Sequence, residues 1–560
     1  MSSASKTTIS DAERNHAYAG SGTKEDPFIV EFHKDDAGNP MNWSELRKWW
    51  ITTIVTFSVF AVTFTSSAYS VSAEQVFQDF DVSTEVFTLG LSLFVLGFAI
   101  GPAVWGPLLT VSFPQSELYG RQPLWITTHI AMVSFLGGSA GSHNIATLLI
   151  LRFFAGTFGG SPLVNSGGTI ADIFPPAQRG LALTIYCVAP FLGPILGPIV
   201  GGFVSQSAGW RWVQGLCTIF IGAVGILGVV FVPETYGPVL LQRRAAQLAR
   251  TDGKVYVSVL EKHQGKKNPA EVFKRALFRP WIFLFLEPIV LIASLYMAII
   301  YGTVYMFMGA MPIVYNEHRG WSAGIGGLSF LGIMVGIILG LIYAIWDNNT
   351  RYTPLFKESI SKSHLPPDPE TRLPPAILGG LALPIGMFAF AWTNAPTIHW
   401  SISIILSSPF GFGCVLVILP IMNYLIDSYT LYAASVLAAA AIFRSIVGAV
   451  FPLFTTQMYH VLGIHWASSV PAFLTLVCAP FPLVMYRYGR AVRMKCWGWD
   501  WDAYGYGYGW RGGVERKEEG QQGFGFGMTP LWADVAMDRW CPVVGLLRRW
   551  SLVVEEGHVH

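Results

Sequence analysis

Residues 180 to 204 read GLALTIYCVAPFLGPILGPIVGGFV and include no charged side chain. About 20 such residues in a helix cross the roughly 30 Å of hydrocarbon in a bilayer. Glycine allows a neighbouring helix to approach closely, and proline removes an internal hydrogen bond and permits a bend. The stretch carries both residue types at Gly193, Pro194, Gly197, Pro198, Gly201 and Gly202. We therefore interpret it as a tightly packed, bendable membrane helix, with ordinary close packing as the alternative.

The composition of the whole chain is that of a membrane protein. Only 12% of its 560 residues are charged, where a soluble protein carries about 25%, and 52% are hydrophobic. This excludes a set of soluble domains as well as fibrous, disordered and disulfide-rich secreted chains. The six cysteines form no CxxC pair, so we expect no metal site and no cofactor. A net charge of +2 gives no general attraction to nucleic acid.

Twelve apolar stretches are long enough to span a membrane, and they fall into two groups of six. The predicted fold is an all-α membrane protein with 12 transmembrane helices in two six-helix halves. The predicted spans are 49–72, 86–108, 122–141, 146–169, 180–204, 212–232, 281–309, 325–347, 374–394, 398–424, 431–456 and 466–487. They divide the chain into an N-terminal tail (1–48), a first half (49–232), a basic linker (233–280), a second half (281–490) and a C-terminal tail (491–560).

The positions of Lys and Arg predict the orientation, because short cytoplasmic loops retain basic residues. The loops on the side of the N-terminus carry ten in the linker and six more, Arg121, Arg179, Arg351, Lys357, Lys362 and Arg372. The loops on the opposite side carry only Arg211 and Arg319. We expect both termini and the linker in the cytoplasm, and we find no signal peptide before the first span.

Two six-span halves joined by a basic loop resemble the major facilitator superfamily, whose halves rock about a site near the bilayer midplane. The Gly-Pro pattern of the fifth span resembles the fifth-span motif of its proton-coupled antiporters. The fourth span, Arg152-Phe153-Phe154-Ala155-Gly156-Thr157-Phe158-Gly159-Gly160, resembles the motif whose arginine is associated with proton transfer. A charge in hydrocarbon is costly without a partner. The alternative is that Arg152 reaches out to the membrane surface.

The loop after the second span resembles the superfamily's latch, in which an acid and a base hold the cytoplasmic face together. Here Glu117, Gly120 and Arg121 match the latch, but residues 109–115 separate them from Gly106-Pro107-Leu108. That insertion either lengthens a working loop or comes from a faulty gene model.

Two charges lie deep in predicted spans. Glu287, followed by Pro288, stands in a stretch from Trp281 to Met311 that has no other formal charge. Desolvation makes such a carboxyl group a candidate for exchanging a proton against substrate. The alternative is a residue at the cytoplasmic interface. Arg444, in the eleventh span, is expected to partner a carboxylate or a backbone carbonyl, or to be purely structural.

Three strings narrow the resemblance to the fungal twelve-span drug:proton antiporters, in the branch of polyamine and multidrug exporters. They are Asn39-Pro40-Met41-Asn42-Trp43, Pro233-Glu234-Thr235-Tyr236 with Leu240 to Arg244, and Pro369-Glu370-Thr371-Arg372-Leu373-Pro374-Pro375. The resemblance covers residues 39 to 490 and implies proton-coupled export of amphipathic or cationic small molecules. Aromatic rings facing a central cavity would contact cations, with Tyr296, Tyr301, Tyr305 and Phe307 as candidates, of which half are expected to face lipid or other helices.

The expected partners are therefore a small-molecule substrate, protons and the bilayer, for a monomer in the plasma membrane or alternatively the vacuolar membrane. No Walker sequence appears, so ATP is not the direct energy source. A membrane enzyme is disfavoured because no HExxH, GxSxG or paired histidines occur. A non-transporting product of an altered transcript is the other alternative, because residues 496–560 change to an aromatic and glycine repeat that cannot build a packed domain.

Overall fold

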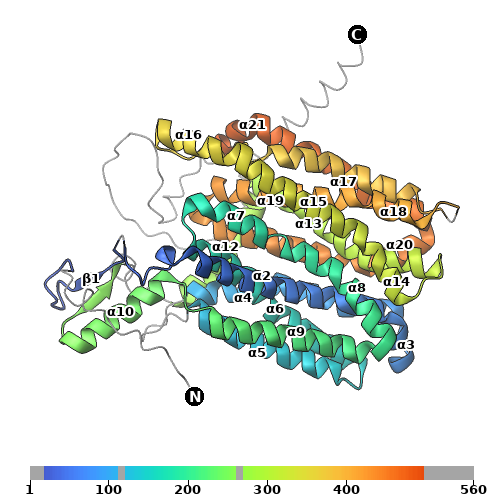
Figure 1. Ribbon diagram of the computed structural model, residues 1–560, viewed down its shortest axis with the longest axis horizontal. Coiled ribbons are helices and arrows are strands. Elements are labelled where there is room, and N and C mark those ends of the chain that lie inside the picture. Colours follow the sequence, from blue (N-terminus) through green and yellow to red (C-terminus); the bar gives the residue numbers. More distant parts are fainter. Residues whose placement is uncertain (1–17, 34, 111–119, 260–268, 396, 497–560) are drawn as a thin grey trace, which may run out of the picture.

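The computed structural model of this chain describes residues 18–33, 35–110, 120–259, 269–395 and 397–496. Helices account for nearly all of the described chain and pack side by side in one elongated bundle (Figure 1). The first half contains α2 (Glu45–Ala68), α3 (Ala73–Phe80), α4 (Thr84–Thr110), α5 (Arg121–Ala140), α6 (Ile145–Ile173), α7 (Pro176–Tyr186), α8 (Ala189–Ala208) and α9 (Trp210–Phe231). The second half contains α12 (Pro269–Leu286), α13 (Pro288–Met311), α14 (Ala323–Gly327), α15 (Leu331–Asp347), α16 (Thr353–Ser363), α17 (Pro374–Trp392), α18 (Trp400–Leu406), α19 (Ser408–Ser428), α20 (Ala433–Cys478) and α21 (Pro480–Cys496).

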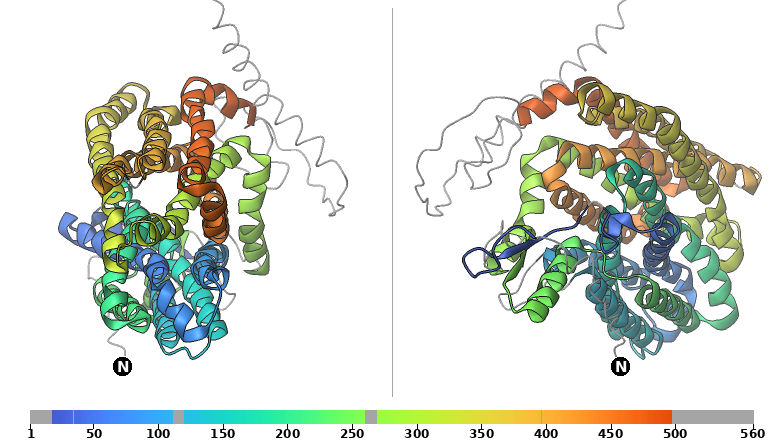
Figure 2. Two further views of the ribbon diagram at one scale, coloured as in Figure 1. Left: turned by 90° about the vertical axis from the view of Figure 1, so that its right-hand side faces the viewer. Right: turned by 60° about the vertical axis from the view of Figure 1, so that its left-hand side comes forward.

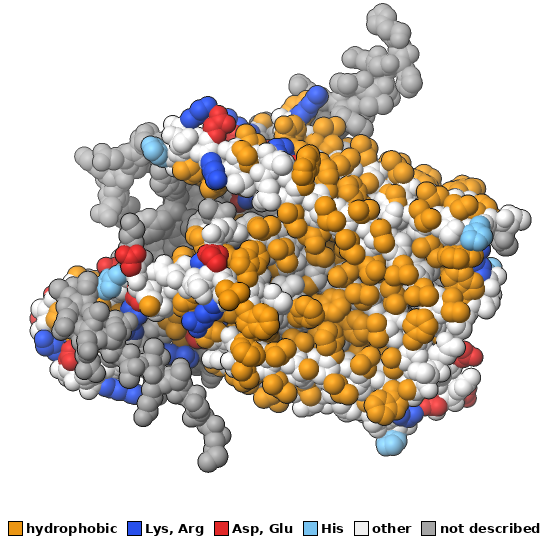
Figure 3. All heavy atoms as spheres, in the orientation of Figure 1, with side chains coloured by type: hydrophobic (Ala, Val, Ile, Leu, Met, Phe, Trp, Pro, Cys, Tyr) orange, Lys and Arg blue, Asp and Glu red, His pale blue; other side chains and the backbone are white. Residues whose placement is uncertain are grey.

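The described residues contain 10 helical runs that are long and apolar enough to cross a membrane. One of these runs, Ala433–Arg493, holds two predicted spans, because its helix is interrupted at Gly463. Another predicted span corresponds to α5, which packs between α6 and α9. The structure is thus consistent with twelve crossings, and apolar side chains cover the flank of the bundle while charges gather toward its ends (Figure 3).

Proline explains why two predicted spans are each broken into two helices. The fifth span is divided between α7 and α8, and Pro190 stands in the first turn of α8. The seventh is divided between α12 and α13, and Pro288 opens α13. Proline disfavours a helical conformation in the residue before it, and Glu287 accordingly adopts φ −108° and ψ 103°.

Glycine makes an equivalent turn in both halves. Gly209 joins α8 to α9 with φ 94° and ψ 164°, and Gly463 interrupts α20 with φ 73° and ψ 165°. Side chains rarely tolerate a positive φ, so glycine is the residue that permits a one-residue turn here. The shared geometry at the fifth-to-sixth and eleventh-to-twelfth spans indicates that the halves are structural repeats.

The two halves meet along two lines of contact, one at α4 and one at α8. Seen end-on, their helices form two groups (Figure 2). Helix α4 of the first half packs against α20 of the second, and α8 packs against α14 and α15. We call the end of the bundle next to α10 (Gly237–Asp252), at the left of Figure 1, the linker end, and we call the other end the opposite end.

A small folded unit lies at the linker end, which differs from the expected all-helical fold. Strand β1 (Phe28–Val30) pairs in parallel with β2 (Tyr256–Ser258), and α10 (Gly237–Asp252) packs against both. Val30, Ala245 and Leu248 form its core. The predicted N-terminal tail and linker therefore fold together, although their sequences lie more than 200 residues apart. We call this unit the clasp.

An ion pair ties the clasp to the segment before the first span. Both carboxylate oxygens of Asp36 accept hydrogen bonds from Arg244, at 2.5 and 3.1 Å, and the backbone N–H of Gly38 donates to Oδ1 at 2.7 Å. Burial acts to raise the pKa of Asp36, but the hydrogen bonds from Arg244 and Gly38 outweigh it and hold the pKa below its usual value. The folded clasp thus favours the ionised carboxylate.

Candidate functional site

Two of the four aromatic candidates lie where the halves meet. Tyr301 and Tyr305 are one helical turn apart on α13, and both are buried. The Tyr305 hydroxyl lies 2.8 Å from the Ser66 hydroxyl of α2, in the first half. The Tyr301 ring packs edge-on to Phe191 of α8, also in the first half, with centroids 6.3 Å apart. Together with Arg444, these residues form what we call the interhalf cluster.

The other two aromatic candidates pack inside the second half. Phe307 contacts the rings of Phe390 and Phe410, with centroids 5.3 and 5.2 Å away. Tyr296 is fully buried beside Gly380 of α17. A helix turns by about 100° per residue, so positions on one apolar span face different neighbours. Only the packing separates the two pairs.

Arg444 reaches the interhalf cluster from α20. Its guanidinium carbon lies 5.3 Å from the centroid of the Tyr301 ring. Its Nε atom is buried and has no hydrogen-bond acceptor among the described residues. No ion pair between described side chains involves Arg444, so the carboxylate partner considered from sequence does not appear in this part of the chain.

Arg152 is fully buried. The alternative, in which its side chain reaches out to the membrane surface, is therefore wrong. Its Nε donates to the Gly90 carbonyl at 2.8 Å, and its two terminal nitrogens donate to the Ser66 carbonyl at 3.2 Å and to Gln214 Oε1 at 3.4 Å. The guanidinium also lies over the Tyr69 ring, 4.1 Å from its centroid. These neutral acceptors come from three different spans, so Arg152 holds the first half together without a carboxylate.

Glu287 occupies the break between α12 and α13, at the linker end of the seventh span. Its side chain is 2% exposed, and the Tyr429 hydroxyl, just past the end of α19, donates to its Oε2 at 3.2 Å. The position agrees with the interface alternative, while the burial is what a proton-exchanging carboxyl group requires. Both hypotheses about its role therefore remain predictions.

The glycines of α8 face two different helices. A Cβ at Gly193, Gly197 or Gly201 would collide with α2, at Thr63, Ser67 and the Ala68 carbonyl respectively. Gly202 points instead across to the second half, where a Cβ would stand 2.6 Å from the Ala323 carbonyl oxygen of α14. One turn earlier, the Pro198 carbonyl approaches Gly327 in the same manner. The pattern thus joins spans one and five and closes the opposite end between the halves.

At the linker end, Arg121 joins three spans of the first half. Its side chain donates to both oxygens of Asp172, at 2.5 and 3.2 Å, from the start of α5 to the end of α6. Glu234, just after α9, accepts from the backbone N–H groups of Arg121 and Gln122 at 3.0 and 3.2 Å. Gly120 precedes with φ 75°. Glu117 and residues 111–119 as a whole lie outside the described residues.

The sequence analysis did not predict that Asp172 and Glu234 bind Arg121, nor that similar ion pairs occur in the second half. Arg372, before α17, donates to Asp427 at the end of α19 at 2.8 Å. Glu370 accepts from Arg493 of α21 at 3.0 Å. Each half thus ties spans together at the linker end with two acids, which meet one arginine in the first half and two in the second. The Pro-Glu-Thr strings at Pro233 and Pro369 were the available signal, although the first follows a span and the second precedes one.

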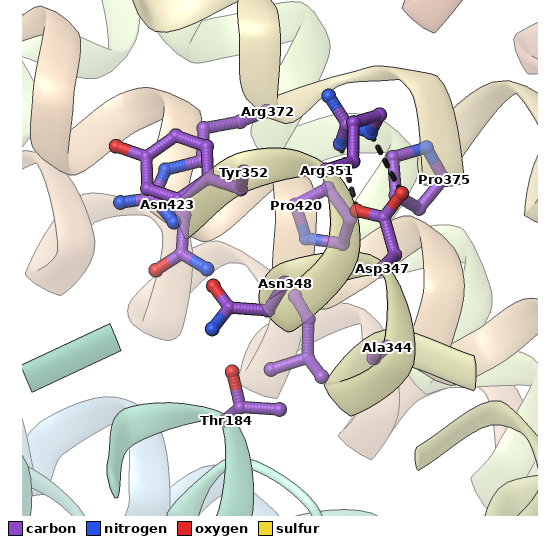
Figure 4. A pocket seen from close by; sticks show the side chains of 11 residues that line it. Thr184, Ala344, Asp347, Asn348, Arg351, Tyr352, Arg372, Pro375, Pro420 and Asn423 are labelled. Carbon is purple, nitrogen blue, oxygen red and sulfur yellow. Dashed lines mark hydrogen bonds and ion pairs between the residues drawn. The ribbon is translucent and has the colours of Figure 1, made fainter. Parts of the chain in front are cut away.

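A cavity of ≈ 40 Å³ lies between the halves at the linker end (Figure 4). Thr184 of α7 lines it from the first half. From the second half it is lined by Asn348, Tyr352 and Arg372, and by the pair of Asp347 and Arg351, which Figure 4 shows hydrogen-bonded at its rim. The cavity therefore lies beside the contact of α7 with α15, at the end away from the glycine contact.

Comparisons with known proteins agree with this architecture. The family model described as Major Facilitator Superfamily matches residues 55–452. The chain is 81% identical over 486 residues to the "Major facilitator-type transporter sorT" of Penicillium rubens, covering 87% of this chain and 91% of that one. It is 56% identical to the "MFS-type efflux pump MFS2" of Trichophyton rubrum, covering 86% and 79%. The structure of the proton:xylose symporter XylE matches with a TM-score of 0.56 at 16% identity, covering 80% and 96%, which shows a shared fold alone.

Proposed function

The chain belongs to the major facilitator superfamily, and we propose that it exports amphipathic small molecules in exchange for protons, with its linker end in the cytoplasm. The resemblance to fungal drug exporters predicted from the sequence motifs is confirmed at the level of the family. Relatives include an efflux pump, a multidrug transporter and a "Citrinin biosynthesis cluster MFS transporter" of Monascus ruber. These names share transport, and the name of the efflux pump adds the outward direction that we propose.

The distribution of ion pairs carries the proposal. Each ion pair between described residues of the bundle joins groups within one half, such as Arg121 with Asp172 and Arg372 with Asp427. The halves themselves touch through apolar packing and hydrogen bonds, among them Ser66 with Tyr305 and Gln206 with Gly324, and an exposed bond from Gln457 to the Glu85 carboxylate. Each half can therefore move as a body without separating a buried charge pair, as rocking between two open states requires.

The closure at one end indicates which state the structure represents. At the opposite end, Gly202 and Gly327 bring α8 and α14 into backbone contact, whereas at the linker end a small cavity lies beside the contact of α7 with α15. We assign this state as closed to the outside of the cell. The basic residues of the clasp and linker support a cytoplasmic linker end, because short cytoplasmic loops retain Lys and Arg.

Glu287 is our candidate for proton coupling. It is buried in the seventh span beside Tyr429 at the end of the tenth, and a buried carboxyl group loses most of its solvation. A neutral, protonated Glu287 and an ionised one would favour different arrangements of Tyr429 and α13. Proton binding could thereby bias the two states of the transporter, provided that its affinity differs between them.

The experiment uses the full chain in liposomes with an imposed pH gradient and two fluorescent amphipathic probes in separate runs, the cationic rhodamine 6G and the anionic sulforhodamine B. The parent protein should move at least one probe, and a protonophore should stop the movement. Glu287→Gln should abolish gradient-driven transport while leaving exchange of labelled for unlabelled probe in place. The matched control is Glu358→Gln, at an exposed carboxylate paired with Lys362. Transport at the parental level in Glu287→Gln would rule out this coupling role.

Two alternatives predict other outcomes in the same assay. A non-transporting product would insert and fold but move no probe in either mode. A transporter that is not coupled to protons would move the probe equally with and without the gradient. Residues 111–115 of the insertion and residues 497–560 of the tail lie outside the described residues.

A further inference from the structure

The two arginines of the bundle interior differ in how their donors are satisfied. Arg152 places its guanidinium nitrogens on Gly90, Ser66 and Gln214. Arg444 has a buried Nε with no acceptor among the described residues. An unmade hydrogen bond of a buried group is costly, and more so for a charged one. The fold thus supplies an acceptor to the Nε of Arg152 and, among the described residues, none to the Nε of the half-buried Arg444.

The surroundings of Arg444 are polar but carry no negative charge. Its guanidinium lies over the Tyr301 ring, and its charge acts on the other half at the Tyr186 hydroxyl, which ends α7, and at the Cys187 thiol just after it. The hydroxyls of Tyr301 and Tyr305 lie 3.5 Å apart beside it. Glu287 is 14 residues before Tyr301 along the same span, roughly 21 Å at 1.5 Å per residue. No described carboxylate neutralises Arg444.

These contacts come from both halves, which is where a rocking transporter holds its substrate. A guanidinium binds a carboxylate with two parallel hydrogen bonds and keeps its charge at every physiological pH. Neighbouring tyrosine hydroxyls can donate to the same oxygens, and their rings accommodate an apolar body. A cationic substrate would meet an uncompensated positive charge instead. Among the amphipathic or cationic substrates expected from the sequence, the cluster therefore disfavours the cationic ones, including polyamines.

We propose that Arg444, with Tyr301 and Tyr305, binds the carboxylate of an amphipathic organic acid, so that this protein selects anionic substrates. The inference rests on the proposed export function and names its substrate class. When the halves part, Arg444 exchanges its unsatisfied position for a paired one. The aromatic faces of Phe191 and Tyr301 hold the apolar part of the same molecule.

The test compares three probes that share one apolar body and differ in charge: 1-pyrenebutyrate, 1-pyrenebutanol and 1-pyrenebutylamine. Binding to the purified full-length chain in detergent at pH 7 is measured by thermophoresis, without any gradient. The parent protein should bind the carboxylate at least tenfold more tightly than the alcohol, and the amine most weakly. Equal affinity for the three probes, or tightest binding of the amine, would overturn the proposal.

Variants assign the preference to Arg444. Arg444→Gln should weaken binding of pyrenebutyrate at least tenfold and leave pyrenebutanol within twofold. Arg444→Lys should retain part of the preference, because it keeps the charge and loses the fork. Equal losses for the acid and the alcohol would refute a charge-specific role. The comparison of probes on the parent needs no variant, so it decides the matter even where Arg444→Gln fails to fold.

Failure of this inference can be told apart from failure of the proposed function. A chain that carries rhodamine 6G in the gradient assay and shows no preference among the pyrene probes is an exporter without an anion site. A chain that prefers pyrenebutyrate and carries nothing has the site but lacks the export activity. The first result rejects the inference alone, and the second rejects the function on which it rests.

Discussion

Gly202 allows the closed state to be tested directly, because its Cα faces the other half. In Gly202→Ala, the new methyl group would lie 2.6 Å from the Ala323 carbonyl oxygen and 3.1 Å from the Gly324 Cα. Both obstacles are backbone atoms, which cannot rotate away. The helices must separate by several tenths of an ångström, and such overpacking costs about 1–3 kcal/mol. This penalty applies only while the opposite end is closed.

The expected result is a shift in the populations of the two states. A difference of about 1–3 kcal/mol changes their ratio by roughly 5- to 150-fold in favour of the open state. Alanine also has a higher helix propensity than glycine, by about 1 kcal/mol, but this gain is equal in both states and does not alter the ratio. Gly222→Ala on α9 is the matched control, because the nearest contact of its new methyl group would be an ordinary 3.8 Å to Val133.

Pulsed spin-label spectroscopy measures the separation at the opposite end. Labels at Ser207→Cys and His318→Cys, both exposed positions beside the contact, report the distance between the halves in a variant whose six native cysteines have been replaced. Gly202→Ala should transfer most of the distance distribution to a longer component, whereas Gly222→Ala should match the parent. An unchanged distribution in Gly202→Ala would show that the contact with α14 does not hold the halves closed.

Three further predictions concern charged side chains: two ion pairs of the bundle and clasp, and the hydrogen bonds of Arg152. The pKa of Asp36 is below its usual value, so its ionised form stabilises the clasp above the unfolded pKa of about 3.9, and this stabilisation is lost as the pH falls through the folded value. Protection of the β1 amides from exchange, relative to an unfolded chain, should therefore fall below about pH 4. Asp36→Asn should remove that dependence. Asp172→Asn breaks a two-bond, partly buried pair with Arg121 and should cost about 3 kcal/mol, more than Asp427→Asn, which removes a single hydrogen bond at a more exposed carboxylate; equal thermal shifts would contradict this order. Arg152→Lys keeps the charge but cannot reach three acceptors in different spans, so thermal unfolding should occur at a lower temperature and transport should fall; a parental melting temperature would show that the forked geometry is dispensable.

The spans and their grouping were predictable from the sequence, because crossing a bilayer is decided by local hydropathy. The broken spans at Glu287 and α7 also had a local signal in Pro288 and Pro190, although we predicted both as continuous. The one-residue turns at Gly209 and Gly463 fall between predicted spans for the same local reason. Residues 39–43 and 240–244 were found as separate strings, and their sequence gave no indication that both belong to the region of the clasp.

The candidate site divides along the same line. The sequence singled out Arg152, Arg444 and Glu287, because a charge in an apolar span stands out in any hydropathy profile. It did not reveal that Arg152 is satisfied and the Nε of Arg444 is not, nor that Tyr301 and Tyr305 face the other half while Tyr296 and Phe307 do not. Those facts depend on the rotation of each helix about its axis and on which helix lies beside it. Hydropathy along one span is nearly the same for every rotation, so only the packing of all the spans together decides them.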